Sequence, residues 1–230
     1  MTQITSFLTS RKVAPFVFLT PFMVLFLVFK VLPVLLAIDM SLSDALSVQP
    51  GKWTFVGLDN FTKVLGNTRF QTSLGVTTAY TVLTLLVLVP FPLILAVVLD
   101  SGRVVKSTVF RVILFLPALT SLVIAGTVFR ILLGSAGLVN SVLSVLGIPP
   151  QRWLEVADLT LPSLVILATW RWTGINMLYF NSGLVNIPKE FYEAASIDGA
   201  NAFQMFWRIT LPLLKPITFF VIILTIIGAH

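Results

Sequence analysis

Long apolar runs without any charge constrain this chain more than any other feature. The clearest run extends from Val13 to Phe29, directly after Arg11 and Lys12. It is too long for the core of a signal peptide, and no small-residue cleavage site follows it. Hydrophobic residues make up 57% of the chain and charged residues only 10%, whereas a soluble domain has about 25% charged residues. The sequence therefore predicts an all-α, polytopic transmembrane helical bundle.

Five segments have the apolar composition of membrane spans. A spanning helix needs about 20 residues. We expect spans over residues 15–40, 73–99, 109–133 and 159–184, and an incomplete one over 216–230. Because the last segment is shorter than a span, we expect a chain that is a C-terminally shortened form of a longer one, or that is unstable alone. The chain as a whole, 1–230, is interpreted as one transmembrane domain.

Lysine and arginine residues indicate which segments face the cytoplasm. If the N-terminus is cytoplasmic, eight basic residues fall inside: Arg11, Lys12, Arg103, Lys106, Arg111, Lys189, Arg208 and Lys215. Five then fall outside: Lys52, Lys63, Arg69, Arg130 and Arg152. The positive-inside rule therefore favours a cytoplasmic N-terminus. This orientation also places the segment 186–215 on the cytoplasmic side.

Composition and motifs exclude several classes of function. The chain has no cysteine and its one histidine is the last residue, His230, so thiol chemistry, cysteine-ligated metals and histidine catalysis are excluded. It has no Gly-rich phosphate loop and no carboxylate pair at a workable spacing. We therefore expect no catalytic residues, no metal site, no cofactor and no enzymatic activity. Basic residues at the edges of a lipid membrane explain the formal charge of +6 without nucleic acid.

The segment Asn186–Pro216 is polar between two apolar stretches and is predicted to form two short helices. Asn186 can cap the first helix, Gly199 can end it with a positive φ angle, and Asn201 can cap the second. One interpretation is a helix pair that lies on the inner leaflet. Such a pair should carry basic residues, yet the stretch 189–198 holds three acidic residues and one basic residue. A small, acidic face suits docking to a protein with a basic-rimmed groove.

The sequence EAASIDGANAFQMFWRITLPLLKP, which ends at Pro216, resembles the EAA loop of the membrane subunits of binding-protein-dependent ABC importers. The family pattern is Glu-Ala-Ala, Asp-Gly-Ala three residues on, and a later Leu-Pro with a further Pro. The matching residues are Glu193, Ala194, Ala195, Asp198, Gly199, Ala200, Phe206, Leu211, Pro212 and Pro216. FVGLDNF (55–61) and WRWTGINMLYFNSGLVNIPKEFYEAA (170–195) resemble the carbohydrate-uptake branch, of the maltose and glycerol-phosphate type. Two departures are Asn181-Ser182 in place of the usual Leu-Ala, and the absence of a sixth span.

The resemblance implies a type I ABC importer permease fold in the cytoplasmic membrane of a prokaryote, and inward transport of a sugar or sugar-like solute. It implies partners as well: a second permease subunit, two nucleotide-binding ATPase subunits and an extracytoplasmic solute-binding protein. ATP hydrolysis would belong to the ATPase subunits. The residues implied in docking to them are Glu193, Ala194, Ala195, Asp198, Gly199, Ala200 and Phe206, with Glu193 paired to a basic residue of that partner.

Polar residues of the expected fourth span are candidates for a solute pathway. Arg171 lies near mid-membrane, where a charge is costly and indicates a function by default. Trp172, Asn176 and Tyr179 share one helical face, and flat aromatic rings with an amide suit the C–H groups and hydroxyls of a sugar. Arg171 points elsewhere on the helix. It can instead pair with an acid or a backbone carbonyl and hold helices together, and this interpretation stands beside the pathway role.

Three other functions compete with that of an importer subunit. A stand-alone channel or secondary transporter would need no loop for docking to an ATPase. An integral-membrane enzyme would need a polar catalytic cluster near a membrane interface, and the sequence shows none. A scaffold subunit is the third, and the loop motif alone does not separate it from a permease.

Overall fold

The regular elements of this protein are helices. The computed structural model describes residues 14–44, 53–102 and 104–228. Within these residues β pairing is limited to one isolated bridge, between Ser43 and Phe55. The all-α prediction is therefore confirmed. The chain folds into two compact units, residues 1–73 and 74–230.

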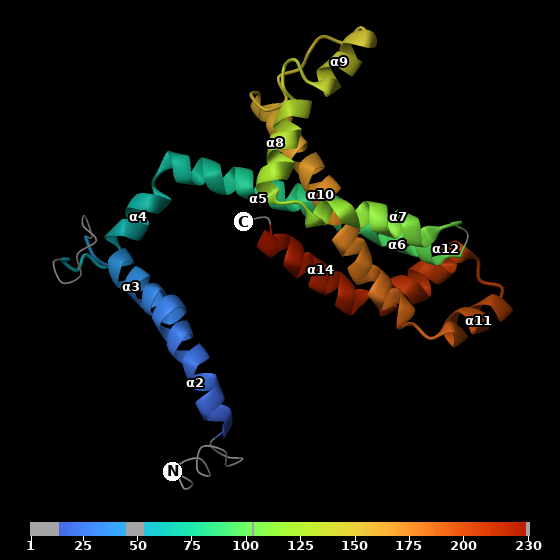
Figure 1. Cartoon of the computed structure of the whole chain (residues 1–230), viewed down its shortest axis with the longest axis horizontal. Coiled ribbons are helices and arrows are strands. Elements are labelled where there is room, and N and C mark those ends of the chain that lie inside the picture. Colours follow the sequence, from blue (N-terminus) through green and yellow to red (C-terminus); the bar gives the residue numbers. More distant parts are fainter. Residues whose placement is uncertain (1–13, 45–52, 103, 229–230) are drawn as a thin grey trace, which may run out of the picture. The chain divides into compact units, whose positions relative to one another are not determined.

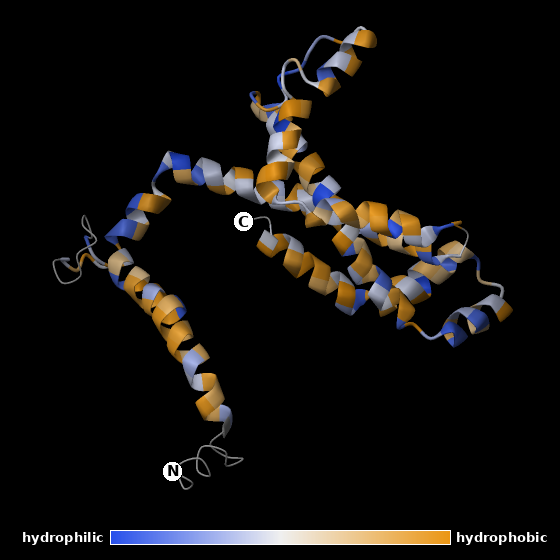
Figure 2. Ribbon diagram, in the orientation of Figure 1, coloured by the Kyte–Doolittle hydropathy of each residue, from blue (hydrophilic) through white to orange (hydrophobic). Residues whose placement is uncertain are grey.

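One long apolar helix dominates the first unit. It consists of α2 (Ala14–Phe26), the π turn η1 (Leu27–Val31) and α3 (Leu32–Ser41). Pro33 has no N–H to donate to the carbonyl of Phe29, and the wider π turn accommodates its ring just before that position. Most residues of this helix are exposed, and Figure 2 shows that most of its ribbon is hydrophobic, which suits contact with lipid.

Asn60 connects the next helix, α4 (Asp59–Leu65), to the end of α3. Its Nδ2 donates to the carbonyl oxygens of Ser41 at 3.0 Å and Ser43 at 2.9 Å. The asparagine of the FVGLDNF stretch thus satisfies backbone groups at the end of a long helix.

The second unit is a helical bundle built around α10 (Figure 1). Its elements are α5 (Thr68–Leu88, which begins in the first unit), α6 (Pro90–Asp100), α7 (Ser107–Phe115), η2 (Leu116–Leu119), α8 (Leu122–Leu132), α9 (Leu138–Val145), α10 (Ala157–Val185), α11 (Lys189–Ile197), α12 (Ala202–Met205), η3 (Phe206–Thr210), α13 (Leu211–Leu213) and α14 (Lys215–Gly228). α10 packs against α6, α7, η2, α8 and α14. The termini of α10 lead to α9 at one end and to α11 at the other (Figure 1).

The core of this unit lies where α10 meets α6 and α14. Its buried members are Leu93, Ala96, Leu99, Met177, Phe180, Leu184, Ile187, Leu214 and Val221. α10 also buries polar residues, among them Ser163, Thr173 and Asn176. α10 thus buries polar and apolar residues alike against its neighbours. Exposed apolar residues are frequent on α7 and α14, whose ribbons are largely in the hydrophobic colour in Figure 2.

Two helices of the described chain are long and apolar enough to cross a membrane, Pro15–Ser41 and Thr68–Asp100. The number rises to four if each of two bent helix pairs counts as one span. α10 has 29 residues but is not among these helices, because its buried polar residues lower its hydropathy. A helix packed inside a bundle does not need an apolar surface all round.

The segment expected as a third span, 109–133, is not one straight helix, although the bent pair passes the test for a span when its two helices are taken together. The helix Ser107–Leu119 meets α8 at an angle of 98°. Thr120 and Ser121 have extended backbone conformations, and Oγ of Ser121 accepts a hydrogen bond from the backbone N–H of Ile124 at 3.2 Å. A serine in this position caps a new helix. Apolar composition alone therefore did not indicate where this segment bends.

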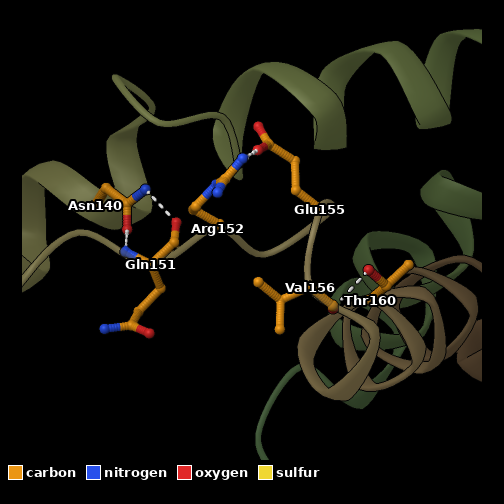
Figure 3. Close-up of polar contacts among 6 residues, drawn as sticks. All are labelled: Asn140, Gln151, Arg152, Glu155, Val156 and Thr160. Atoms are coloured by element: carbon orange, nitrogen blue, oxygen red, sulfur yellow. Dashed lines mark hydrogen bonds and ion pairs between the residues drawn. The ribbon is translucent and has the colours of Figure 1, made fainter.

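One buried amide organises the connection between α8 and α10. Asn140 of α9 is 2% exposed. Its Nδ2 donates to the carbonyl of Gln151 at 2.9 Å, and its Oδ1 accepts from the N–H of Gln151 at 2.9 Å and from Nε1 of Trp153 at 3.1 Å. Figure 3 shows the Asn140–Gln151 bonds beside the ion pair of Arg152 and Glu155. This connection is thus held in one arrangement by an amide with both of its polar atoms bonded.

Candidate functional site

The loop segment, residues 186–215, leaves the end of α10 through a turn that differs from the one expected. Asn186 does not cap α11. Its Nδ2 donates to the carbonyl of Ser182 at 2.8 Å, so it closes the end of α10, and Pro188 takes the N-cap position of α11. Asn186 lies two residues before that N-cap position, and Ile187 between them is buried in the core. The prediction of an Asn186 cap is therefore wrong.

The turn between α11 and α12 follows the sequence prediction. Gly199 has φ +77°, a left-handed conformation that glycine adopts without strain. The backbone N–H of Ala200 then donates to the carbonyl of Ala195 at 2.9 Å. Asn201 and Gln204 form a capping box, with each side chain accepting from the other's backbone N–H at 2.9 Å. The glycine and the asparagine thus have the local roles predicted for them.

The loop residues named from the family pattern differ in how far they face solvent. Glu193, Ala194, Asp198 and Gly199 are exposed, whereas Ala195 and Ala200 are half-buried. Within the described residues neither Glu193 nor Asp198 forms an ion pair. Their carboxylates are therefore available to an external cation. Phe206 is half-buried and packs against the core of its own chain.

Large apolar side chains lie exposed on the same loop segment. Ile197 is 87% exposed, Phe203 72% and Trp207 53%. The rings of Phe203 and Trp207 meet edge to face with their centroids 6.1 Å apart. Exposed apolar groups among polar ones are typical of a protein-binding surface. Sequence reasoning missed Ile197, although it lies one helical turn after Glu193 and thus on the same side of α11.

A cavity of about 250 Å³ lies between α5, α10 and α14. Trp172, Asn176 and Tyr179 line it, as their shared helical face predicted. Tyr80 and Thr84 of α5 and Thr225 of α14 also line it. Sequence reasoning missed these three, because nothing in the order of residues indicates which faces of distant helices meet. Arg171 does not belong to the lining.

Asn176 has a structural bond as well as a place in the cavity wall. Its Nδ2 donates to the backbone carbonyl of Leu88 at 3.1 Å, and the residue is 5% exposed. Within a regular helix the carbonyl of residue 88 accepts from the N–H of residue 92, which is Pro92 and has none. The amide of α10 therefore supplies the donor that the proline removes from its neighbour.

Arg171 has a similar role at the broken third segment. Its Nη1 donates to the carbonyl of Thr120, and it lies 3.2 Å from Oγ1 of the same residue. Thr120 sits at the bend between η2 and α8, where the regular helical bonds are interrupted. The guanidinium carbon is also 5.0 Å from the ring centroid of Trp172. Arg171 thus bonds a carbonyl and holds two helices together, the alternative that the sequence had left beside a pathway role.

The chemistry of the cavity suits an uncharged ligand with hydroxyl groups. Its lining, in the part of the chain that the structure describes, has no charged side chain. Aromatic rings of Trp172, Tyr179 and Tyr80 provide apolar faces with polar edges. Nδ2 of Asn176 uses one of its two N–H groups on Leu88, so Oδ1 and the second N–H of that amide are left to a ligand. Such a wall can bind and orient a solute, and it offers no carboxylate for acid or base catalysis.

Known proteins match most of this chain. The family model described as "Binding-protein-dependent transport system inner membrane component" matches residues 88–230. The chain is 48% identical to the arabinooligosaccharides transport system permease protein AraP of Bacillus subtilis (strain 168) over 221 residues, which are 95% of this chain and 69% of that protein. It is 34% identical to the trehalose/maltose transport system permease protein MalF of Thermococcus litoralis over 215 residues, 93% of this chain and 72% of that protein.

Solved structures resemble the fold over nearly the same length. A crystal structure of a bacterial ABC transporter involved in the import of the acidic polysaccharide alginate contains a chain that is 25% identical and superposes with a TM-score of 0.81. The match covers 94% of this chain and 72% of that one. A second structure, of the alginate transporter in complex with an alginate pentasaccharide-bound periplasmic protein, superposes with a TM-score of 0.80.

Proposed function

This chain belongs to the family of inner membrane components of binding-protein-dependent transport systems, and we propose that it carries a sugar or short oligosaccharide inward as one permease subunit of an ATP-driven importer. The family match and the superposition on importer chains confirm the fold and the resemblance first read from the loop. An oligosaccharide built of arabinose is the first solute to test, because the AraP relative is 48% identical.

The observation that carries the proposal is the exposed face of α11. Glu193 and Asp198 are unpaired within the described residues, and Ile197 stands 87% exposed between them. A separate ATPase subunit with a cleft lined by apolar groups and rimmed by a basic residue would satisfy both the charge and the apolar surface. Glu193 would pair with that basic residue, and the small side chains of Ala194 and Ala195 would permit close approach.

The proposed assembly has this chain, a second permease subunit, two nucleotide-binding ATPase subunits and an extracytoplasmic solute-binding protein. The alginate transporter seen with its periplasmic protein supports the last of these partners. The N-terminus and the loop segment would both be cytoplasmic, in keeping with the distribution of basic residues. ATP hydrolysis would occur in the ATPase subunits, and their closure would move the docked loop as a rigid body.

The cavity between α5, α10 and α14 is the proposed solute site. Trp172 and Tyr179 would stack on the apolar faces of a sugar ring, and Oδ1 of Asn176 would accept from a sugar hydroxyl. Arg171 would act indirectly, by holding Trp172 and the bend at Thr120 in place.

Co-purification tests the docking. We would express the chain with a tagged ATPase subunit from the same transport system and compare Glu193→Lys with Asp158→Lys. Asp158 is an exposed acid at the opposite end of α10 and serves as the matched control. We expect Glu193→Lys to abolish recovery of the ATPase and Asp158→Lys to leave it unchanged. Equal recovery with both variants would contradict the proposal.

Uptake tests the transport role. Vesicles that hold the whole complex and receive its binding protein should accumulate a labelled arabino-oligosaccharide only when ATP is present on the ATPase side. Uptake at the same rate without ATP would instead support a stand-alone channel or secondary transporter.

A further inference from the structure

Only a small part of the surface of α11 packs against the rest of its unit. Seven of its nine residues are exposed, and the two that are not are Tyr192 and Ala195. Tyr192 is the α11 residue that packs against the buried core. A force applied to α11 therefore reaches the bundle through the Tyr192 side chain and through the chain connections at its ends.

The Tyr192 hydroxyl is bonded inside the protein. Its Oη lies 2.9 Å from Oγ1 of Thr210, a residue 18 positions later that is 4% exposed. Oγ1 of Thr210 also lies 3.5 Å from the carbonyl of Met205, which can only accept. Tyr192 therefore donates to Thr210, and Thr210 donates toward Met205. Burial keeps water from competing for these groups, which strengthens the bond.

Thr210 lies where the backbone leaves regular α-helical geometry, shortly before α14. It is the last residue of the π turn η3, and π turns are frequent at functional positions. Buried Leu214 follows four residues later, at the junction where the helix Ala202–Leu213 bends by 67° into α14. A shift of Thr210 therefore acts on the start of α14.

α14 connects this junction to the cavity. Leu224 and Thr225 line the cavity and lie about 15 Å along α14 from its first residue. We infer that Tyr192 and Thr210 are positioning residues, whose hydrogen bond carries a displacement of α11 to α14 and so to the wall of the cavity. This inference rests on the proposed docking of the loop segment, and it adds the element of the permease that receives the motion.

The first test compares transport with ATP hydrolysis in vesicles that hold the whole complex, with a labelled arabino-oligosaccharide as probe. Tyr192→Phe and Thr210→Val each remove the bond and keep the shape of the side chain. We expect each variant to lower the amount of solute transported per ATP hydrolysed by about threefold to tenfold. This factor corresponds to the free energy of one buried hydrogen bond. The double variant should lose no more than Thr210→Val alone, because Thr210→Val already removes the bond that Tyr192→Phe removes.

Thr218→Val is the matched control. Oγ1 of Thr218 donates to the carbonyl of Leu214 at 3.0 Å, within the same stretch of chain but not between two elements. This variant should transport normally. The ATPase subunit should co-purify with all of these variants, since none alters the exposed face of α11.

The second test does not depend on the identity of the solute. The chain has no cysteine, so Ser196→Cys on α11 and Phe219→Cys on α14, both exposed, can carry a pair of spin labels. In the assembled complex we expect one narrow distance distribution, equally narrow before and after ATP is trapped. Tyr192→Phe should broaden it when ATP is trapped, because α11 then moves without α14.

The outcomes separate this inference from the docking on which it rests. If Tyr192→Phe and Thr210→Val change neither the transport ratio nor the distance distribution, while Glu193→Lys abolishes ATPase recovery, the link is overturned and the docking stands. Additive losses in the double variant would also overturn the link. If Glu193→Lys retains the ATPase, the docking itself fails.

Discussion

Asn176 of α10 donates a hydrogen bond from Nδ2 to the backbone carbonyl of Leu88, a residue 88 positions earlier in the chain. That carbonyl lacks its helical partner because residue 92 is a proline. The bond repairs a gap in one helix with a side chain from another, and it fixes the amide of Asn176 in the wall of the cavity. The proposed role of Asn176 in solute binding and its role in packing therefore meet in one residue, and substitutions can separate them.

Replacing Asn176 by leucine should destabilise the protein by about 1–3 kcal/mol, because the buried carbonyl of Leu88 then has no donor. Thermal unfolding of the purified chain in detergent would measure the loss. The control is a double variant that combines Asn176→Leu with Pro92→Ala. The alanine restores the backbone N–H that can donate to the carbonyl of Leu88 within the helix. We expect this pair to recover much of the lost stability. A double variant as unstable as Asn176→Leu alone would show that the bond is not what stabilises this site.

Arg171→Met should also destabilise the protein by about 1–3 kcal/mol, since the carbonyl of Thr120 loses its donor at the bend. Thr120→Val removes the side-chain hydroxyl, with its bonds to Arg171 and to the carbonyl of Pro117, and keeps the contact between Arg171 and the carbonyl of Thr120, so it should cost less than Arg171→Met. Thermal unfolding under the same conditions would compare the two. If Thr120→Val cost as much as Arg171→Met, the contact of Arg171 with the carbonyl would not be what stabilises the bend.

Gly174→Ala should disrupt the contact between α10 and α7. A Cβ at residue 174 would lie 2.0 Å from the carbonyl oxygen of Leu114, a backbone atom that cannot move aside without the helix. Overpacking of this kind costs about 1–3 kcal/mol. Gly126→Ala in α8 is the control, because a Cβ there would meet no atom within 4 Å. Alanine favours helix over glycine, so Gly126→Ala should leave the unfolding temperature unchanged or raise it. Equal unfolding temperatures for the two variants would contradict the close contact at Gly174.

Ile197→Ser should weaken recovery of the ATPase subunit at least tenfold while it leaves the isolated chain as stable as before. Ile197 is 87% exposed, so its replacement removes almost no internal packing, but a buried isoleucine at a subunit interface contributes about 1.5–3 kcal/mol. Val145→Ser in α9 is the control, since Val145 is 86% exposed at the other end of α10. Both variants should unfold at the temperature of the unaltered chain. A loss of ATPase recovery with Val145→Ser as large as with Ile197→Ser would argue against α11 as the specific docking surface.

Local features of the candidate site could be predicted from the sequence. Gly199 and Asn201 act within one or two turns of backbone, and their preferences for a left-handed residue and an N-cap do not depend on distant contacts. Apolar runs likewise indicated helices wherever nothing interrupted them. The role of Asn186 was predicted wrongly because a side chain between two helices can bond to either one, and α11 begins two residues too late for Asn186 to be its N-cap.

The amino-acid sequence by itself determined the all-α membrane architecture, the shape of the loop turn and the helical face shared by Trp172, Asn176 and Tyr179. Only the tertiary structure decided which helices close the cavity and which carbonyls Asn176 and Arg171 bond. It also decided that the third apolar segment bends by 98°. The physical reason is how far apart along the chain the interacting residues lie. Helix formation and capping depend on neighbours along the chain, whereas these bonds join residues 88 and 51 positions apart and exist only once the bundle has packed.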